Sequence, residues 1–136
     1  MTPRERIRRE CAARGKPAVV SACIDALEGR EIDPSLVAAL GGPASRWWLA
    51  EAGPESDYWV RVWAARGLLW EWDDSATSAI AAALEDESWR VREMALKVIA
   101  RNLVDELEVR ASALQDDPVP RVRSAAVRAL VRLSGA

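Results

Sequence analysis

A short motif that returns at a fixed spacing constrains this chain more than any other feature. Valine followed by arginine occurs at Val60-Arg61, Val91-Arg92 and Val122-Arg123, with 31 residues between successive copies. The match extends without a gap to an acid six residues before each arginine and to a bulky apolar residue eight after each valine. Several columns matched at one period predict a stack of repeated helical units.

Each repeat is expected to hold two helices. In the second helix of the middle repeat, Val91, Ala95 and Ile99 recur every four positions, which is the spacing of a buried helical stripe. A helix pair of this size cannot bury its apolar face alone, so neighbouring pairs must stack. The chain is therefore predicted to form one domain over residues 1–136, with three repeats over residues 44–136. Shorter first helices are expected at about residues 44–52, 76–84 and 104–114.

Residues 1–43 depart from the repeat. The segment Thr2-Pro3-Arg4-Glu5 has the pattern of a capping box with proline at the first helical position, and predicts a helix that begins at Pro3 and continues to about residue 13. Two more helices are expected at about residues 17–27 and 34–41. We expect this part to form a helical cap, or a degenerate repeat, that covers one end of the stack.

The repeat columns resemble the HEAT-repeat family, and in particular the short HEAT-like repeats first associated with phycobilisome lyases. The shared pattern is an aspartate in the turn, then Val-Arg, then Ala-Ala and a late leucine. Here it reads Asp117, Val122-Arg123, Ala125-Ala126 and Leu130, and the resemblance covers about residues 44–133. It implies an all-α fold, a right-handed α-α superhelix or HEAT-like solenoid of antiparallel helix pairs, here with an N-terminal helical cap. Nothing in the residues supports a bilin lyase activity.

The acid and arginine columns have a structural interpretation. A carboxylate in the turn and an arginine at the start of the next helix can hydrogen-bond within and between repeats, and arginine offers a two-pronged donor for that purpose. In the resembling family such groups form a ladder along the stack. The resemblance assigns this ladder to Glu55, Arg61, Asp86, Arg92, Asp117 and Arg123.

One surface of the second helices carries the candidate binding residues. Positions i, i+3, i+7 and i+11 of each second helix fall on one face, which we name the second-helix ridge. HEAT second helices usually line the concave side of the superhelix. Although the formal net charge is −2, this ridge holds seven basic groups and one acid, Glu93. An acidic or phosphate-bearing partner would fit it, while an ordinary solvated face explains the same residues. The candidates are Trp59, Arg66, Trp70, Arg90, Lys97, Arg101, Arg121, Arg128 and Arg132.

Tryptophan is the second anomaly in the composition, with seven tryptophans, one tyrosine and no phenylalanine. Trp63 shares a column with Met94 and Ala125, which places it in the expected core. Trp59 and Trp70 stand where the other repeats carry arginine. They are either exposed anchors of a binding surface or packing that fills the capped end.

Functions of different classes remain open for this ridge. The leading hypothesis is a non-catalytic protein–protein interaction module, a scaffold or adaptor that binds an acidic partner. The alternative is nucleic-acid binding, because aromatic rings beside basic groups are how proteins hold single strands. Trp59 and Trp70 near Asp57 and the basic ridge also give a remote resemblance to alkylation-repair DNA glycosylases, whose catalytic positions do not map onto this chain.

Composition narrows the chemistry. Half of the residues are hydrophobic and 29% are charged, which is typical of a soluble globular protein. The absence of histidine removes the commonest general base and most zinc sites. Two cysteines, Cys11 and Cys23, cannot build a disulfide framework, which favours the cytoplasm. We expect no catalytic residue, no metal, no cofactor and no membrane segment, and an open repeat end that would allow a homodimer.

Overall fold

The structure is a computed structural model that describes residues 1–135. Throughout that range every regular element is a helix, which confirms the predicted all-α class. Short 3₁₀ helices precede several α-helices: η1 (Pro54–Ser56), η2 (Asp74–Ala76), η3 (Asp105–Leu107) and η4 (Leu114–Asp116). The α-helices are α1 (Pro3–Arg14), α2 (Lys16–Leu27), α3 (Pro34–Gly41), α4 (Ala44–Glu51), α5 (Tyr58–Trp70), α6 (Thr77–Ala83), α7 (Trp89–Asn102), α8 (Glu108–Ala113) and α9 (Pro120–Leu133).

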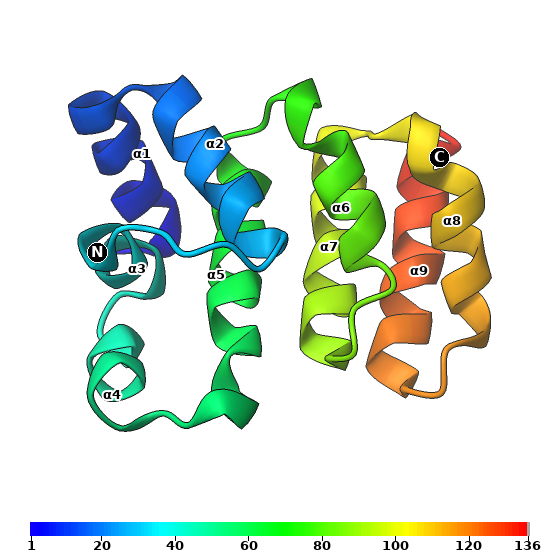
Figure 1. Cartoon of the computed structure of the whole chain (residues 1–136). Helices are drawn as coiled ribbons and strands as arrows, with labels where there is room; N and C mark the ends of the chain where they lie inside the picture. The colour runs from blue at the N-terminus through cyan, green and yellow to red at the C-terminus, as the bar shows by residue number, and fades with distance from the viewer. Residues whose placement is uncertain (136) are drawn as a thin grey trace.

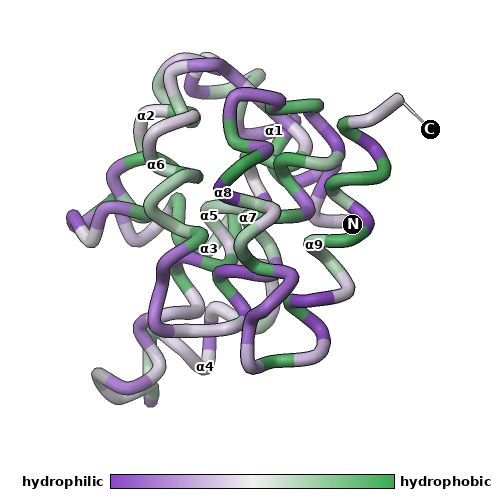
Figure 2. The backbone as a smooth tube through the Cα atoms, turned by 90° about the vertical axis from the view of Figure 1, so that its right-hand side faces the viewer, coloured by the Kyte–Doolittle hydropathy of each residue, from purple (hydrophilic) through white to green (hydrophobic). Residues whose placement is uncertain are grey.

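The helices form two layers (Figure 1). The three second helices α5, α7 and α9 lie side by side in one layer, with α5 against α7 and α7 against α9. The other layer holds α2, α6 and α8, which pack against α5, α7 and α9 respectively. Figure 2 looks onto the end of the stack formed by α8 and α9. Repeated stacking of helix pairs makes the chain an α-helical solenoid.

The core follows the stripe that the spacing of apolar residues predicts. Val91, Ala95 and Ile99 of α7 are fully buried, and so are their equivalents Val122 and Ala126 of α9. Burial of these stripes between the two layers supplies the main driving force for stacking, since each fully buried valine or isoleucine side chain contributes about 1.5–3 kcal/mol.

At the N-terminal end, α2 rather than α4 packs beside α5. By its position in the repeat, α4 corresponds to α6 and α8 of the later repeats. However, α4 packs mainly on α3 and lies away from the layer that holds α6 and α8 (Figure 1). Leu49 of α4 is 48% exposed, whereas the equivalent residues Ile80 and Ala111 are fully buried. In the first repeat, α2 from the N-terminal segment therefore takes the place beside α5 that α6 and α8 take beside α7 and α9.

The apolar content of the two helices explains this exchange. α2 buries Val19, Val20, Cys23 and Ala26, while Ser45 is the one residue that α4 buries in the described structure. The helix with more apolar side chains gains more by entering the layer, so α2 takes the place beside α5.

The remaining N-terminal helices close one end of the stack. α1 and α3 pack on α5, and the capping box at the start of α1 forms as predicted: Glu5 N–H donates to Thr2 Oγ1 at 3.1 Å, and Thr2 N–H donates to the Glu5 carboxylate at 2.9 Å. No helix among residues 1–135 is long and apolar enough to cross a membrane.

Candidate interaction surfaces

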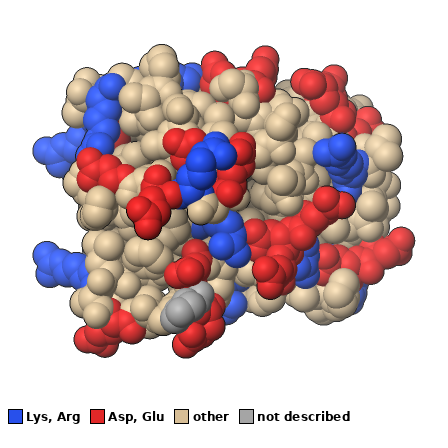
Figure 3. Space-filling model, viewed as in Figure 1, with Lys and Arg blue, Asp and Glu red and all other residues tan. Residues whose placement is uncertain are grey.

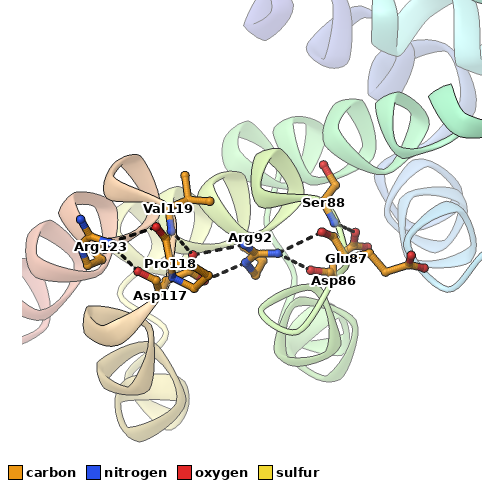
Figure 4. A network of polar contacts seen from close by, with 8 residues as sticks. All are labelled: Asp86, Glu87, Ser88, Arg92, Asp117, Pro118, Val119 and Arg123. Atoms are coloured by element: carbon orange, nitrogen blue, oxygen red, sulfur yellow. Dashed lines mark hydrogen bonds and ion pairs between the residues drawn. The ribbon is translucent and has the colours of Figure 1, made fainter.

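Two arginine–aspartate pairs join consecutive repeats. Arg61 of α5 donates from Nε and Nη2 to the carboxylate of Asp86, at 2.7 and 3.2 Å. Arg92 of α7 makes the same pair of bonds to Asp117, at 2.8 and 3.2 Å (Figure 4). This two-pronged geometry fixes the turn of one repeat against the second helix of the repeat before it.

The same carboxylates hold the turns in which they lie. Asp86 accepts a hydrogen bond from the Ser88 N–H at 2.8 Å, and Asp117 accepts one from the Val119 N–H at 2.9 Å. Burial alone would raise the pKa of the Asp117 carboxyl, but the hydrogen bonds from Arg92 and Val119 outweigh burial, and this pKa lies below its ordinary value. Each aspartate thus stabilises its own turn and links two repeats.

The two ends of the expected ladder differ from its middle. Glu55 is exposed and forms no ion pair with any residue of the described chain. Arg123 donates only from Nη1, to the main-chain oxygens of Asp117 and Pro118 at 2.8 and 3.2 Å. The structure therefore joins four of the six ladder residues and leaves the first and the last without a side-chain partner in the described chain.

On the ridge, Trp59 is enclosed by its neighbours. It is half-buried, and its ring stacks on that of Trp63 with centroids 6.3 Å apart and planes 26° apart. The Arg90 guanidinium lies over the rings of Trp59 and Trp89, at 5.4 and 4.5 Å from their centroids. Cation–π contacts of this kind hold arginine against the protein and leave less of the indole for a partner.

Trp70 is covered in a similar way. The guanidinium groups of Arg4 and Arg101 lie 5.3 and 4.4 Å from its ring centroid. The indole Nε1 is buried and has no hydrogen-bond acceptor in the described structure. Trp70 therefore ties the N-terminal helix α1 to α7, which is a packing role.

Arg66 is also part of the fold. Its Nη2 donates to the main-chain oxygen of Leu40 in α3 at 2.8 Å, and the side chain is half-buried. Burial, and to a smaller extent nearby Arg6, lowers the pKa of its guanidinium. The N-terminal half of the second-helix ridge is thus engaged with its own neighbours.

The C-terminal half of the ridge is more open. Arg121 donates two hydrogen bonds to the buried carboxylate of Glu93, at 2.9 and 3.3 Å, and Lys97 Nζ lies 3.8 Å from the same carboxylate. Arg128 and Arg132 are exposed and make no ion pair with any residue in 1–135. A groove of about 330 Å³ between α7 and α9 is lined by Glu93, Lys97, Pro120, Arg121, Ser124 and Arg128.

Comparison with known families decides the identity of the fold. A family model of HEAT repeats matches residues 45–131, the span that holds all three copies of the motif. This chain belongs to the HEAT-repeat family. HEAT repeats generally mediate protein–protein interactions, and the family is typically a non-catalytic scaffold. Comparison with curated proteins and with solved structures gave no match.

A further hollow in this HEAT-repeat protein lies among α2, α3, α4 and α5. Its volume is about 520 Å³, and its apolar lining includes Val37, Trp48, Leu49 and Val60. Sequence reasoning missed this hollow, because the repeat register places Leu49 in a buried column. The available signal was that α4 is shorter than α2 and carries fewer apolar side chains, five against eight.

The described residues hold no group of three cysteine, aspartate or glutamate side chains that could bind a metal ion. Cys23 is buried, and burial raises the pKa of its thiol to about 12, while Cys11 is half-buried with a pKa raised by the same cause. Neither thiol is poised as a nucleophile, because a reactive cysteine needs a lowered pKa.

Proposed function

We propose that this HEAT-repeat chain is a non-catalytic scaffold module that binds an acidic segment of a partner protein on the C-terminal half of the second-helix ridge. The observation that carries the proposal is the groove between α7 and α9, which has Lys97 on one helix and Arg121 and Arg128 on the other. Glu93 is the one acid of this groove, and it is buried beneath them.

Charge separation between the two layers supports an acidic partner. Figure 3 views the face of α2, α6 and α8, where carboxylates gather around fewer basic groups. On that side Asp105, Glu106 and Glu108 of η3 and α8 are exposed. A molecule with one acidic and one basic side orients an approaching charged partner before contact. An acidic segment is therefore directed toward α7 and α9.

The covered tryptophans favour a protein partner over a nucleic acid. Single-stranded nucleic acids bind by stacking bases on open aromatic faces. One face of Trp59 is stacked on Trp63, and arginines lie over Trp59 and Trp70. With these faces occupied, the ridge offers electrostatic attraction without a stacking platform.

Both cysteines are free thiols, which supports a cytoplasmic setting for the module.

The proposal is tested by fluorescence anisotropy with two labelled probes, a peptide rich in glutamate and aspartate and a single-stranded oligonucleotide. The test variant reverses two ridge charges, Lys97→Glu with Arg128→Glu. The matched control reverses two exposed charges elsewhere, Arg46→Glu on α4 with Arg110→Glu on α8. We expect the ridge variant to weaken peptide binding at least about tenfold and the control to leave it unchanged.

Two results would overturn this function. Tighter binding of the oligonucleotide, falling steeply with salt and lost in the ridge variant, would assign the ridge to nucleic acid. Absence of peptide binding at low salt would show that the ridge is an ordinary solvated face.

A further inference from the structure

One stripe of side chains recurs on all three second helices and faces the next repeat. It consists of the motif arginine and the apolar residues four and eight positions later. On α5 and α7, the arginine binds the aspartate of the following repeat, and each of these helices packs against the following second helix. The stripe holds Arg61, Ala65 and Leu69 on α5, Arg92, Leu96 and Ala100 on α7, and Arg123, Val127 and Val131 on α9.

On α9 this stripe is uncovered. Leu96 of α7 is fully buried, whereas its equivalent Val127 is 48% exposed. Leu69 and Ala100 are partly buried, whereas their equivalent Val131 is 48% exposed. α9 lies at the end of the stack toward which Figure 2 looks. Two exposed valines one helical turn apart form an apolar strip of the kind that packs against another helix.

Arg123 is already oriented for a carboxylate. In Arg92, Nη1 is held by the main-chain oxygens of Asp86 and Glu87, at 2.7 and 3.2 Å, and this leaves Nε and Nη2 to bind Asp117. Nη1 of Arg123 is held by the two equivalent main-chain oxygens, at 2.8 and 3.2 Å (Figure 4). Its Nε and Nη2 bind no acceptor among the described residues, so the pair that recognises a carboxylate is preset and open.

We propose that this outer face of α9 docks an α-helical segment of a partner protein that carries an aspartate or glutamate in the turn before its helix. The molecule itself shows the required chemistry, because the equivalent face of α7 is covered by Asp117 and α9. The fork of Arg123 would take the carboxylate, and Val127 and Val131 would take the apolar side of the helix. This surface is separate from the ridge groove, so the inference does not depend on the proposed function.

A second copy does not supply the surface that fits this face. In each copy, Asp117 and the inner side of α9 already cover α7. Two copies meeting through the outer faces of α9 would bring no acid to the fork of Arg123, because residues 119–133 carry four arginines and no acid. A helix preceded by a carboxylate offers the complementary charge and hydrogen-bonding groups.

The test uses a labelled synthetic peptide with the sequence of residues 104–134, the segment that covers α7. Its anisotropy is titrated with the full chain. We expect binding that weakens at least about tenfold when the peptide carries Asp117→Asn or the protein carries Arg123→Gln, with no further loss when both changes are combined. Arg46→Gln removes an exposed charge from α4, away from α9 (Figure 1), and serves as the matched control.

A second measurement removes the dependence on the peptide's own folding. A chain with residues 103–133 duplicated directly after Leu133 keeps the 31-residue period. We expect the midpoint of thermal unfolding of this extended chain to lie above that of the natural chain. Introducing Arg123→Gln into the extended chain should abolish the increase.

Three results would overturn the inference. The first is peptide binding that is unchanged by Arg123→Gln. The second is absence of both peptide binding and a raised midpoint. The third is a dimer of the natural chain, found by light scattering and dispersed by Val127→Asp, since a second copy would then be the occupant.

Discussion

Arg92 and Asp117 form the most enclosed ion pair of the described chain, with 14% of the arginine side chain and 4% of the aspartate side chain exposed. Replacing Arg92 with glutamine would leave a buried carboxylate without its cation. We expect the free energy of unfolding to fall by about 3 kcal/mol, because removing one partner of a buried pair leaves the other desolvated. Urea denaturation measures the change. The control is Arg30→Gln, which breaks exposed pairs and should cost less than about 1 kcal/mol. Equal losses in the two variants would contradict the structural role of the pair.

The lowered pKa of Asp117 predicts acid sensitivity. In the unfolded chain an aspartate titrates near pH 3.9, and in the folded chain Asp117 titrates lower. The stabilisation is therefore present above about pH 4 and is lost as the pH falls through the folded value. Unfolding followed between pH 2 and 6 should show a shallower decline for Asp117→Asn than for the natural chain. Some decline should remain, because the pKa values of Asp33 and Asp73 are lowered as well, mainly by hydrogen bonds from Ser35 and Ser75. Identical slopes would refute the prediction.

The contact between α3 and α5 leaves no room for a side chain at Gly41. A Cβ atom at this position would lie 2.7 Å from the six-membered ring of Trp63. Gly41→Ala should lower the free energy of unfolding by about 1–3 kcal/mol, since overpacking forces side chains out of their preferred positions. The emission of Trp63 should shift at the same time. Alanine stabilises an open helix relative to glycine, so a raised melting temperature would mean that α3 moves freely on α5.

Trp59 and Trp70 should behave as packing residues and not as binding anchors. Truncating either to alanine removes ring contacts with Trp63 or with the arginines, and should lower the free energy of unfolding by about 2 kcal/mol or more. The exposed Trp47 is the control, with an expected change below about 0.5 kcal/mol. Acidic-peptide binding by the folded fraction should be unaltered. Retained stability together with lost binding would restore the anchor interpretation.

The two thiols should differ in reactivity. Cys23 is 1% exposed with a pKa of about 12, so very little thiolate is present at pH 8. In a Cys11→Ala variant, a disulfide reagent at pH 8 should label no thiol until urea unfolds the chain. The reciprocal Cys23→Ala variant should react through half-buried Cys11 without denaturant. Rapid labelling of Cys23 in buffer would show that α2 leaves α5 readily.

Periodicity carried most of the fold prediction. The buried stripes, the two layers and the family follow from residues that repeat every 31 positions, because each column sees the same neighbours in every repeat. That reasoning fails where a column has a different neighbour. Leu49 shares a column with Ile80, yet α2 competes with α4 for the same place, and register alone carries no information on that competition.

The sequence predicts which positions form the second-helix ridge. Whether each of their side chains is exposed or covered depends on residues of other helices. Arg4 belongs to the N-terminal cap and lies over Trp70, a contact between segments with no shared register. Glu93 was visible as a single acid among cations, but its burial beneath Arg121 follows from the stacking of α7 and α9. Periodic patterns locate a face of a helix, and long-range contacts decide which of its side chains remain free.

The placement of α2 beside α5 sets the order in which the molecule can assemble. α6 ends at Ala83, shortly before α7 begins at Trp89, so that pair closes a short loop. α2 ends at Leu27, and α5 begins at Tyr58, so their contact closes a much longer one. Longer loops cost more chain entropy, and distant contacts slow folding. The C-terminal repeats are therefore expected to form first, and α2, although the ribosome makes it before them, is expected to find its place last.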